Sequence, residues 1–369
     1  MSLLLFACSS ASTARRARAR VNFNTELAED ERIAEQLHRS VSELLRAVVR
    51  DEVGAQHITP EDELQHQFFA KALRAIGRRV DAAPHEPLIL KSYSPDGVSY
   101  LITVAFFRGG GAAPEVDKIL ELHAYPDGDG YRFRCPFAFY DSLPTVEVGG
   151  ITYHGRLPLD VARAEAFARF KANLDRELKV DPRPLDYYRF DSLDHLLKAH
   201  GIVYDCRKCN SLAHDLGFLD DGGNAFLTGT GDERYIFGFV RDYLGLHFEA
   251  SELYAPLVNG MAAYYGGYGL SGDDMATLKG QLRARLAEDP DFDFLREYRL
   301  GRRSSVQRHF TNYVLGALLF EAAVESRGFA HAMQLVRSGA NGDRFFANLR
   351  SVLATEESGF HELIVRLIG

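Results

Sequence analysis

Hydrophobic residues recur with two different periods along the chain, and the change of period divides it into parts. At residues 33–48 and 60–76 apolar side chains return every three or four positions, which predicts two helices that each bury one face. Between residues 88 and 153 apolar and polar side chains alternate, which predicts strands. After residue 157 the helical spacing returns and continues, with interruptions, to the C-terminus. The pattern therefore predicts an α+β protein with a mostly helical second half.

The alternating segment contains the turn sequences of antiparallel hairpins. Pro-Asp-Gly at 95–97 and Asp-Gly-Asp-Gly at 127–130 each separate two strand-like runs, and a last strand is predicted at 146–153. Helices followed by such strands predict a curved sheet wrapped around one side of the helices, over residues 23–156. In element order this segment resembles the ketosteroid-isomerase-like cone, which implies a mouth for small molecules or partner chains. His123 is the candidate for a functional side chain in that mouth, and an ordinary strand position is the alternative.

A linking segment and a larger domain follow. The helical spacing at 158–178 and the two prolines of DPRPLD predict a linking helix and linker over residues 157–184. The domain at 185–369 is predicted to begin with a strand, a helix capped by Ser192 and a second strand, NAFLTGT. Its remaining predicted helices are 233–244, 256–265, 272–287, 304–326, 329–336, 342–353 and 360–368.

The first two of those helices are spaced like the active-site helices of a zinc peptidase. The second opens near Pro256 and ends at a Gly-Gly pair, where glycine supplies the left-handed end. TGTGDERY before the pair, LVNGMAAYYGG in the second helix and NYVLGALLFEAAVESRGFAHAMQLVRSG further on resemble bacterial gluzincin-like sequences over roughly residues 185–369. The resemblance implies H-E-x-x-H on the first helix, a glutamate ligand on the second, and NAFLTGT as the edge strand along which substrate lies.

The ligands of that family are replaced in this chain. Aligned by the flanking pattern, the two histidines and the catalytic glutamate of the first helix fall on Phe237, Arg241 and Gly238, and the glutamate of the second helix falls on Asn259. Phenylalanine and glycine offer no donor atom, and a guanidinium roughly 4 Å from a zinc ion would repel it by about 8 kcal/mol. The resemblance thus implies a metallopeptidase-like scaffold without zinc, cofactor or catalysis.

Such a scaffold would use the old substrate cleft for binding. The cleft would be lined by Phe237, Gly238, Arg241, Asn259 and Tyr264, and it would hold a peptide or a partner segment. The planar fork of Arg241 suits a carboxylate, which it would clamp.

Two alternatives remain open at this level. A hydrolase with relocated or metal-free chemistry would draw on His247, Glu249 and His309, with Tyr313 one helical turn after His309. A structural envelope protein would need no ligand. The pair Cys206 and Cys209 is a weak candidate metal site, because a structural zinc needs four ligands, and in an exported protein the pair could instead form a disulfide.

Composition, charge and the first residues bear on location and partners. The net charge of -8 comes from mixed acids and bases, which predicts neither nucleic-acid nor polybasic membrane binding. No run approaches the roughly 18 apolar residues of a membrane-spanning helix. Residues 1–22 form a leader in which Ala7, Cys8 and the serines after it resemble a truncated bacterial lipoprotein signal. We therefore expect a periplasmic or secreted lipoprotein anchored at Cys8, or a cytoplasmic protein if the leader is not a signal.

Overall fold

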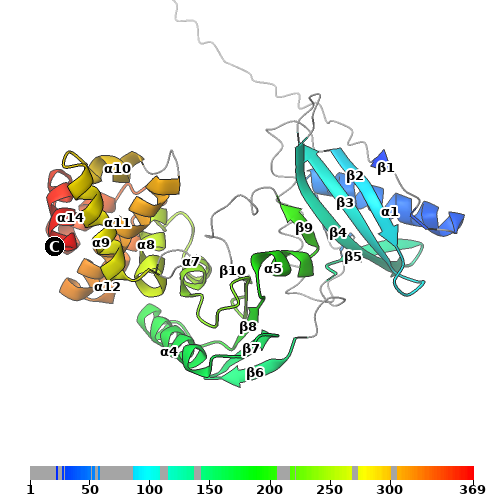
Figure 1. Ribbon diagram of the computed structural model, residues 1–369, viewed down its shortest axis with the longest axis horizontal. Coiled ribbons are helices and arrows are strands. Elements are labelled where there is room, and N and C mark those ends of the chain that lie inside the picture. The colour runs from blue at the N-terminus through cyan, green and yellow to red at the C-terminus, as the bar shows by residue number, and fades with distance from the viewer. Residues whose placement is uncertain are drawn as a thin grey trace, which may run out of the picture. The chain divides into compact units, whose positions relative to one another are not determined.

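The computed structural model shows an α+β chain that divides into two compact units (Figure 1). It describes residues 22–23, 27–28, 30–50, 52–54, 57–58, 86–108, 115–136, 143–205, 217–220, 222–267, 273–300 and 306–369. The first unit contains Met1–Pro136 and Gly201–Cys206, and the second contains Phe137–His200 and Arg207–Gly369. The predicted helix at 60–76 and residues 1–21 of the leader, with Cys8, lie outside the described residues.

The first unit combines one described helix with a largely antiparallel sheet. The helix is α1 (Glu31–Arg50), and the strands are β1 (Asn22–Phe23), β2 (Glu86–Tyr93), β3 (Tyr100–Arg108), β4 (Glu115–Asp127), β5 (Gly130–Arg134) and β9 (Ile202–Asp205). The order runs from β1 to β5, and β9 adds to β4. The apolar stripe of α1 is buried as its spacing predicts, and Ser40 Oγ on this helix accepts a 3.0 Å hydrogen bond from Tyr131 N. Both predicted hairpins are confirmed as β2–β3 and β4–β5.

His123 lies on β4 within the core of the first unit. Its side chain is buried, and Nδ1 accepts a 2.9 Å hydrogen bond from Arg134 Nε. Burial and the neighbouring Arg134 charge lower the pKa of His123 to about 4. The imidazole is therefore neutral near pH 7 and is held by the adjacent strand.

Strand β9 joins this sheet after a long excursion of the chain through the second unit. Glu121 N donates a 2.7 Å hydrogen bond to Gly201 O just before β9 begins. Gly201 has φ +73°, and a Cβ there would lie 2.4 Å from Glu121 O, so both the conformation and the space require glycine. The first unit therefore needs residues far beyond its own contiguous segment.

The second unit begins with a hairpin that the sequence pattern presents as one strand. The predicted strand at 146–153 is β6 (Thr145–Val148) and β7 (Ile151–Gly155), joined at Gly149 and Gly150. Both glycines have positive φ, +59° and +79°, as a two-residue hairpin turn with matching twist requires. The hairpin belongs to the second unit, and the units divide near Pro136 instead of in the proline-containing linker at 157–184.

The sheet of the second unit is mixed. Its described strands follow the order β10 (Gly217–Leu219), β11 (Ala225–Thr228), β8 (Leu185–Arg189), β7, β6, and β7, β8 and β11 run parallel. Helix α4 (Val161–Leu178) connects β7 to β8, and α5 (Leu193–Ala199) follows β8 with the predicted Ser192 cap, whose Oγ accepts from His195 N. The expectation that NAFLTGT forms the edge strand is wrong, because β11 lies between β8 and β10.

Helices make up most of the remaining described part of the second unit. They are α7 (Ile236–His247), α8 (Ala255–Gly266), α9 (Met275–Glu288), α10 (Phe294–Leu300), α11 (Val306–Arg327), α12 (Phe329–Val336), α13 (Phe345–Leu353) and α14 (Phe360–Ile368), with a short 3₁₀ turn at Glu357–Gly359. Helices α4 and α7 meet on the sheet, since the ring of Phe167 packs 5.1 Å from both Tyr187 on β8 and Phe239 on α7. Among the described helices none has the length and apolar character to cross a membrane.

Candidate functional site

The segment TGTGDERY forms the turn that places the start of α7. Thr228 Oγ1 and Thr230 Oγ1 lie 2.9 Å apart, and Asp232 N donates to Thr230 Oγ1 at 3.1 Å. The hydroxyl of Tyr187 donates to Asp232 O and accepts from Tyr235 N, each at 3.0 Å. These bonds link the turn to the central strand β8, so the first residues of α7 have a defined position above the sheet.

A buried ion pair reinforces that turn. Arg189 on β8 donates through Nη1 to Glu233 Oε1, and the two side chains are 3% and 8% exposed. Arg189 Nη2 also donates to Leu157 O at 2.6 Å, and Glu233 Oε1 accepts from Asp160 N at 3.1 Å. The pair therefore joins β8, the turn before α7 and the segment leading into α4.

Helix α8 is held between α7 and α11 by glycines at both contacts. A Cβ at Gly260 on α8 would lie 2.2 Å from the carbonyl carbon of Gly316 on α11, and a Cβ at Gly316 would lie 2.4 Å from Pro256 O. At the other contact, a Cβ at Gly266 would lie 2.5 Å from Phe237 N. The backbones thus approach so closely that a side chain larger than hydrogen does not fit at any of these three positions.

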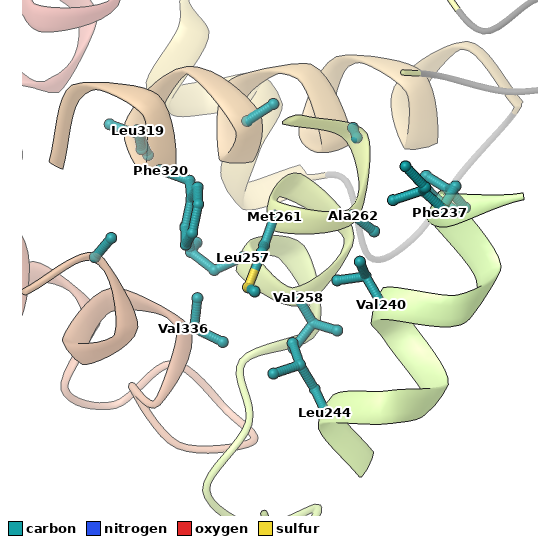
Figure 2. Close-up of a cluster of buried hydrophobic side chains, with 14 of the residues drawn as sticks. Phe237, Val240, Leu244, Leu257, Val258, Met261, Ala262, Leu319, Phe320 and Val336 are labelled. Atoms are coloured by element: carbon teal, nitrogen blue, oxygen red, sulfur yellow. The ribbon is translucent and has the colours of Figure 1, made fainter. Parts of the chain in front are cut away.

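The positions expected for the first histidine ligand and for the catalytic glutamate, Phe237 and Gly238, lie in the interior at the start of α7. Phe237 is 3% exposed, and its ring lies 6.1 Å from that of Tyr313 on α11. Figure 2 shows Phe237, Val240 and Leu244 of α7 in the same apolar cluster as residues of α8 and α11. Gly238 is covered by the ring of Tyr235, whose Cε1 would be 2.4 Å from an added Cβ. Apolar side chains therefore fill the space that the first histidine ligand of a zinc site would occupy.

The other predicted cleft residues lie in different surroundings. Arg241 is 28% exposed, and its Nε donates to Asp242 Oδ1 at 3.1 Å, while Asp242 Oδ2 accepts a 3.2 Å hydrogen bond from Leu219 N on β10. Asn259 is partly exposed on α8. The ring of Tyr264 lies 5.4 Å from that of Phe320, and burial followed by the charge of Glu321 raises its pKa. The structure brings Phe237 and Tyr313 together, and it puts Arg241 next to the sheet edge.

The residues of the relocated-site alternative are spread along the helices. His247 lies ten residues after Phe237, which is about 15 Å along the helix axis. Its ring packs 4.7 Å from Tyr243, and burial, followed by the charge of Arg183, lowers its pKa. Glu249 is exposed after the end of α7. The side chain of His309, on α11, and both Cys206 and Cys209 lie outside the part of the structure that is described.

The structure contains a buried polar cluster between α4 and α7 that was not predicted from the sequence. Lys171 Nζ donates to Asp175 Oδ2 at 2.9 Å and to Arg183 O at 3.0 Å, and the hydroxyl of Tyr243 donates to Asp175 Oδ1. Burial and the Asp175 carboxylate raise the pKa of Tyr243. The signal in the sequence was a lysine and an aspartate four residues apart on a helix face that is otherwise apolar. With each charge paired, the cluster attaches α7 to α4.

The candidate site as a whole offers no assembled metal centre among the described residues. No three or more histidine, cysteine or acidic side chains in the described ranges gather in a way that could hold a metal ion. No protein-family model, curated protein or solved structure matches the chain. Inferences about its function therefore rest on the residues themselves.

Proposed function

We propose that the chain is a metallopeptidase-like protein without zinc catalysis, which binds a peptide or partner segment in a bacterial envelope. The envelope location rests on the signal-like Ala7-Cys8 sequence alone. The absence of zinc chemistry and the binding role rest on the residues around α7.

The observation that carries the proposal is the burial of Phe237. A catalytic zinc needs three protein ligands around an open, water-filled position. At the first ligand position this chain has a benzyl side chain that is 3% exposed and packed against Tyr313. To rebuild the site, that side chain would have to leave the core, which costs about 3 kcal/mol or more for a large aromatic side chain.

Arg241 supports the binding role. Its guanidinium is partly exposed beside β10, where Asp242 already takes one backbone N–H of the strand. A guanidinium can bind a carboxylate through two parallel hydrogen bonds. Because Arg241 Nε is bonded to Asp242, we expect an incoming carboxylate to compete with Asp242 for this side chain.

A peptide titration tests the proposal. The probe is a random octapeptide library with a fluorescent label at the N-terminus and a free carboxylate at the C-terminus, followed by fluorescence anisotropy. We expect binding to the wild type and about tenfold weaker binding to Arg241→Gln, because a hydrogen-bonded charge partner is lost. Mass spectrometry of the same samples is expected to find the peptides intact.

Arg234→Gln is the matched control. Arg234 is an exposed arginine in the turn just before α7, and we expect its substitution to leave the affinity unchanged. Equal affinities of the wild type and Arg241→Gln would remove the carboxylate clamp. Cleavage of the peptides by the protein would contradict the loss of catalysis.

A further inference from the structure

A groove of about 280 Å³ opens between α12, the start of α13 and the loop that joins α7 to α8. Its polar lining comes from Glu252, Gln334, Arg337, Arg344 and Asn348, and Met333 contributes apolar surface. Arg241 is not among the lining residues, so this groove is a different place from the one considered above.

The walls of the groove are tied together by backbone hydrogen bonds. Gly339 N donates to Glu252 O and Ala340 N donates to Ser251 O, each at 2.9 Å. Tyr254 N donates to Val336 O, also at 2.9 Å. The α7–α8 loop is thus fastened to the end of α12, and the groove has a defined shape before any ligand enters, which lowers the entropic cost of binding.

The charges in the groove leave an excess of one positive charge. Arg337 Nη2 pairs with Glu252 Oε1 at 2.6 Å, and the guanidinium of Arg337 also lies 4.8 Å from the ring centre of Phe248. Arg344 makes a 3.5 Å contact to the backbone oxygen of Arg337. One carboxylate and two guanidinium groups favour a ligand with a single negative charge.

The neutral side chains of the groove determine which other groups a bound anion should carry. Asn348 Nδ2 donates to Gln334 O at 2.8 Å and to Ser338 Oγ at 3.0 Å. With both hydrogens of Nδ2 used, the group that Asn348 can offer to a ligand is its Oδ1, an acceptor. Met333 provides apolar surface beside these polar atoms.

We propose that this groove binds the C-terminal carboxylate of a peptide or acylated amino acid. The carboxylate pairs with Arg344, the N–H of the last residue donates to Asn348 Oδ1, and the last side chain packs on Met333. The planar guanidinium of Arg344 can bind a carboxylate through two parallel hydrogen bonds. A C-terminal residue carries this carboxylate and an N–H donor on the same Cα, so one residue can reach both Arg344 and Asn348. The groove holds this ligand whether or not Arg241 clamps a peptide elsewhere.

Three small probes test the assignment by NMR titration of the full chain. N-acetyl-L-leucine carries the carboxylate, N-acetyl-L-leucinamide lacks the charge, and inorganic phosphate is a tetrahedral anion. We expect N-acetyl-L-leucine to bind about tenfold more tightly than its amide, and Arg344→Gln to remove that difference. Glu252→Gln is expected to tighten binding of the acid, because it removes the negative charge that occupies Arg337.

Arg350→Gln is the control for the loss of a nearby arginine, since Arg350 lies on α13 and Arg344 directly precedes this helix. Arg350 is exposed, pairs with Glu356 and does not line the groove, so its substitution is expected to leave binding unchanged. Equal binding of the acid and the amide, or an Arg344→Gln variant that binds like the wild type, would overturn the proposal. Phosphate binding that depends on Arg344, without binding of N-acetyl-L-leucine, would overturn it in favour of a phosphate site. The octapeptides of the Arg241 titration also carry a C-terminal carboxylate, so that titration is run in the Arg344→Gln background, where the groove no longer prefers the acid. Failure of one proposal is then separable from failure of the other.

Discussion

Gly316→Ala is expected to lower the free energy of unfolding of the second unit by about 3 kcal/mol, at the upper end of the usual cost of overpacking. The new Cβ would lie 2.4 Å from Pro256 O and would also meet the backbone of Gly260. Both obstacles are backbone atoms of α8, so no side chain can turn aside and the two helices must separate. Urea unfolding followed by far-ultraviolet circular dichroism measures the change, since the chain contains no tryptophan.

Gly280→Ala is the matched control for that substitution. Gly280 lies inside α9, and a Cβ there would meet nothing within 4 Å. We expect this substitution to stabilise the protein by up to about 1 kcal/mol, because alanine favours the helix more than glycine does. Destabilisation of similar size by both substitutions would contradict the close crossing of α8 and α11.

Glu233→Gln is expected to cost about 3 to 5 kcal/mol, because it leaves the Arg189 guanidinium buried without its counter-charge. The two side chains are 3% and 8% exposed, so water cannot replace the lost carboxylate. Urea unfolding followed by circular dichroism measures this loss in the free energy of unfolding. Hydrogen exchange of the Asp160 amide, which donates to Glu233, should also become faster.

The exposed pair of Lys198 and Asp194 provides the comparison. These side chains form a 2.7 Å ion pair but are 55% and 68% exposed. We expect Asp194→Asn to change the free energy of unfolding by less than about 0.5 kcal/mol, as is usual for a surface pair on a helix. Equal effects of Glu233→Gln and Asp194→Asn would show that the Arg189 pair does not secure the turn before α7.

Elements defined by local sequence could be predicted well. The hairpins β2–β3 and β4–β5 follow from turn residues next to alternating strands, and α8 follows from Pro256 at its start and glycine at its end. Gly149 and Gly150 carried the same kind of signal, since a glycine pair between short strands marks a hairpin. The prediction of one continuous strand at 146–153 did not use that signal and was wrong.

Features that depend on distant partners could not be predicted in this way. Strand β11 is an interior strand because β10 pairs with its free side. The sheet of the first unit is completed by β9, which follows residues of the second unit in the sequence. A sequence pattern records how each strand is buried but not which strand lies next to it.

The candidate site, like the fold, could be predicted only in part. The resemblance to gluzincins implies that Phe237, Arg241 and Asn259 occupy the ligand positions, and under that alignment their chemistry argues against zinc. It does not tell whether these side chains share a cleft, because that depends on the glycine contacts of α8 with both neighbouring helices. Those contacts place Phe237 in the core, while Arg241 lies at the surface beside β10.

The zinc content of the purified protein tests the central claim most directly. Untagged protein is incubated with zinc, separated from free metal by gel filtration and measured by elemental analysis, beside the variant Cys206→Ser/Cys209→Ser. We expect less than about a tenth of an equivalent of zinc in the double variant, because Phe237, Gly238, Arg241 and Asn259 supply no set of three zinc ligands. About one equivalent of zinc that survives the loss of both cysteines would contradict the loss of the metal site and place a metal centre elsewhere in the chain.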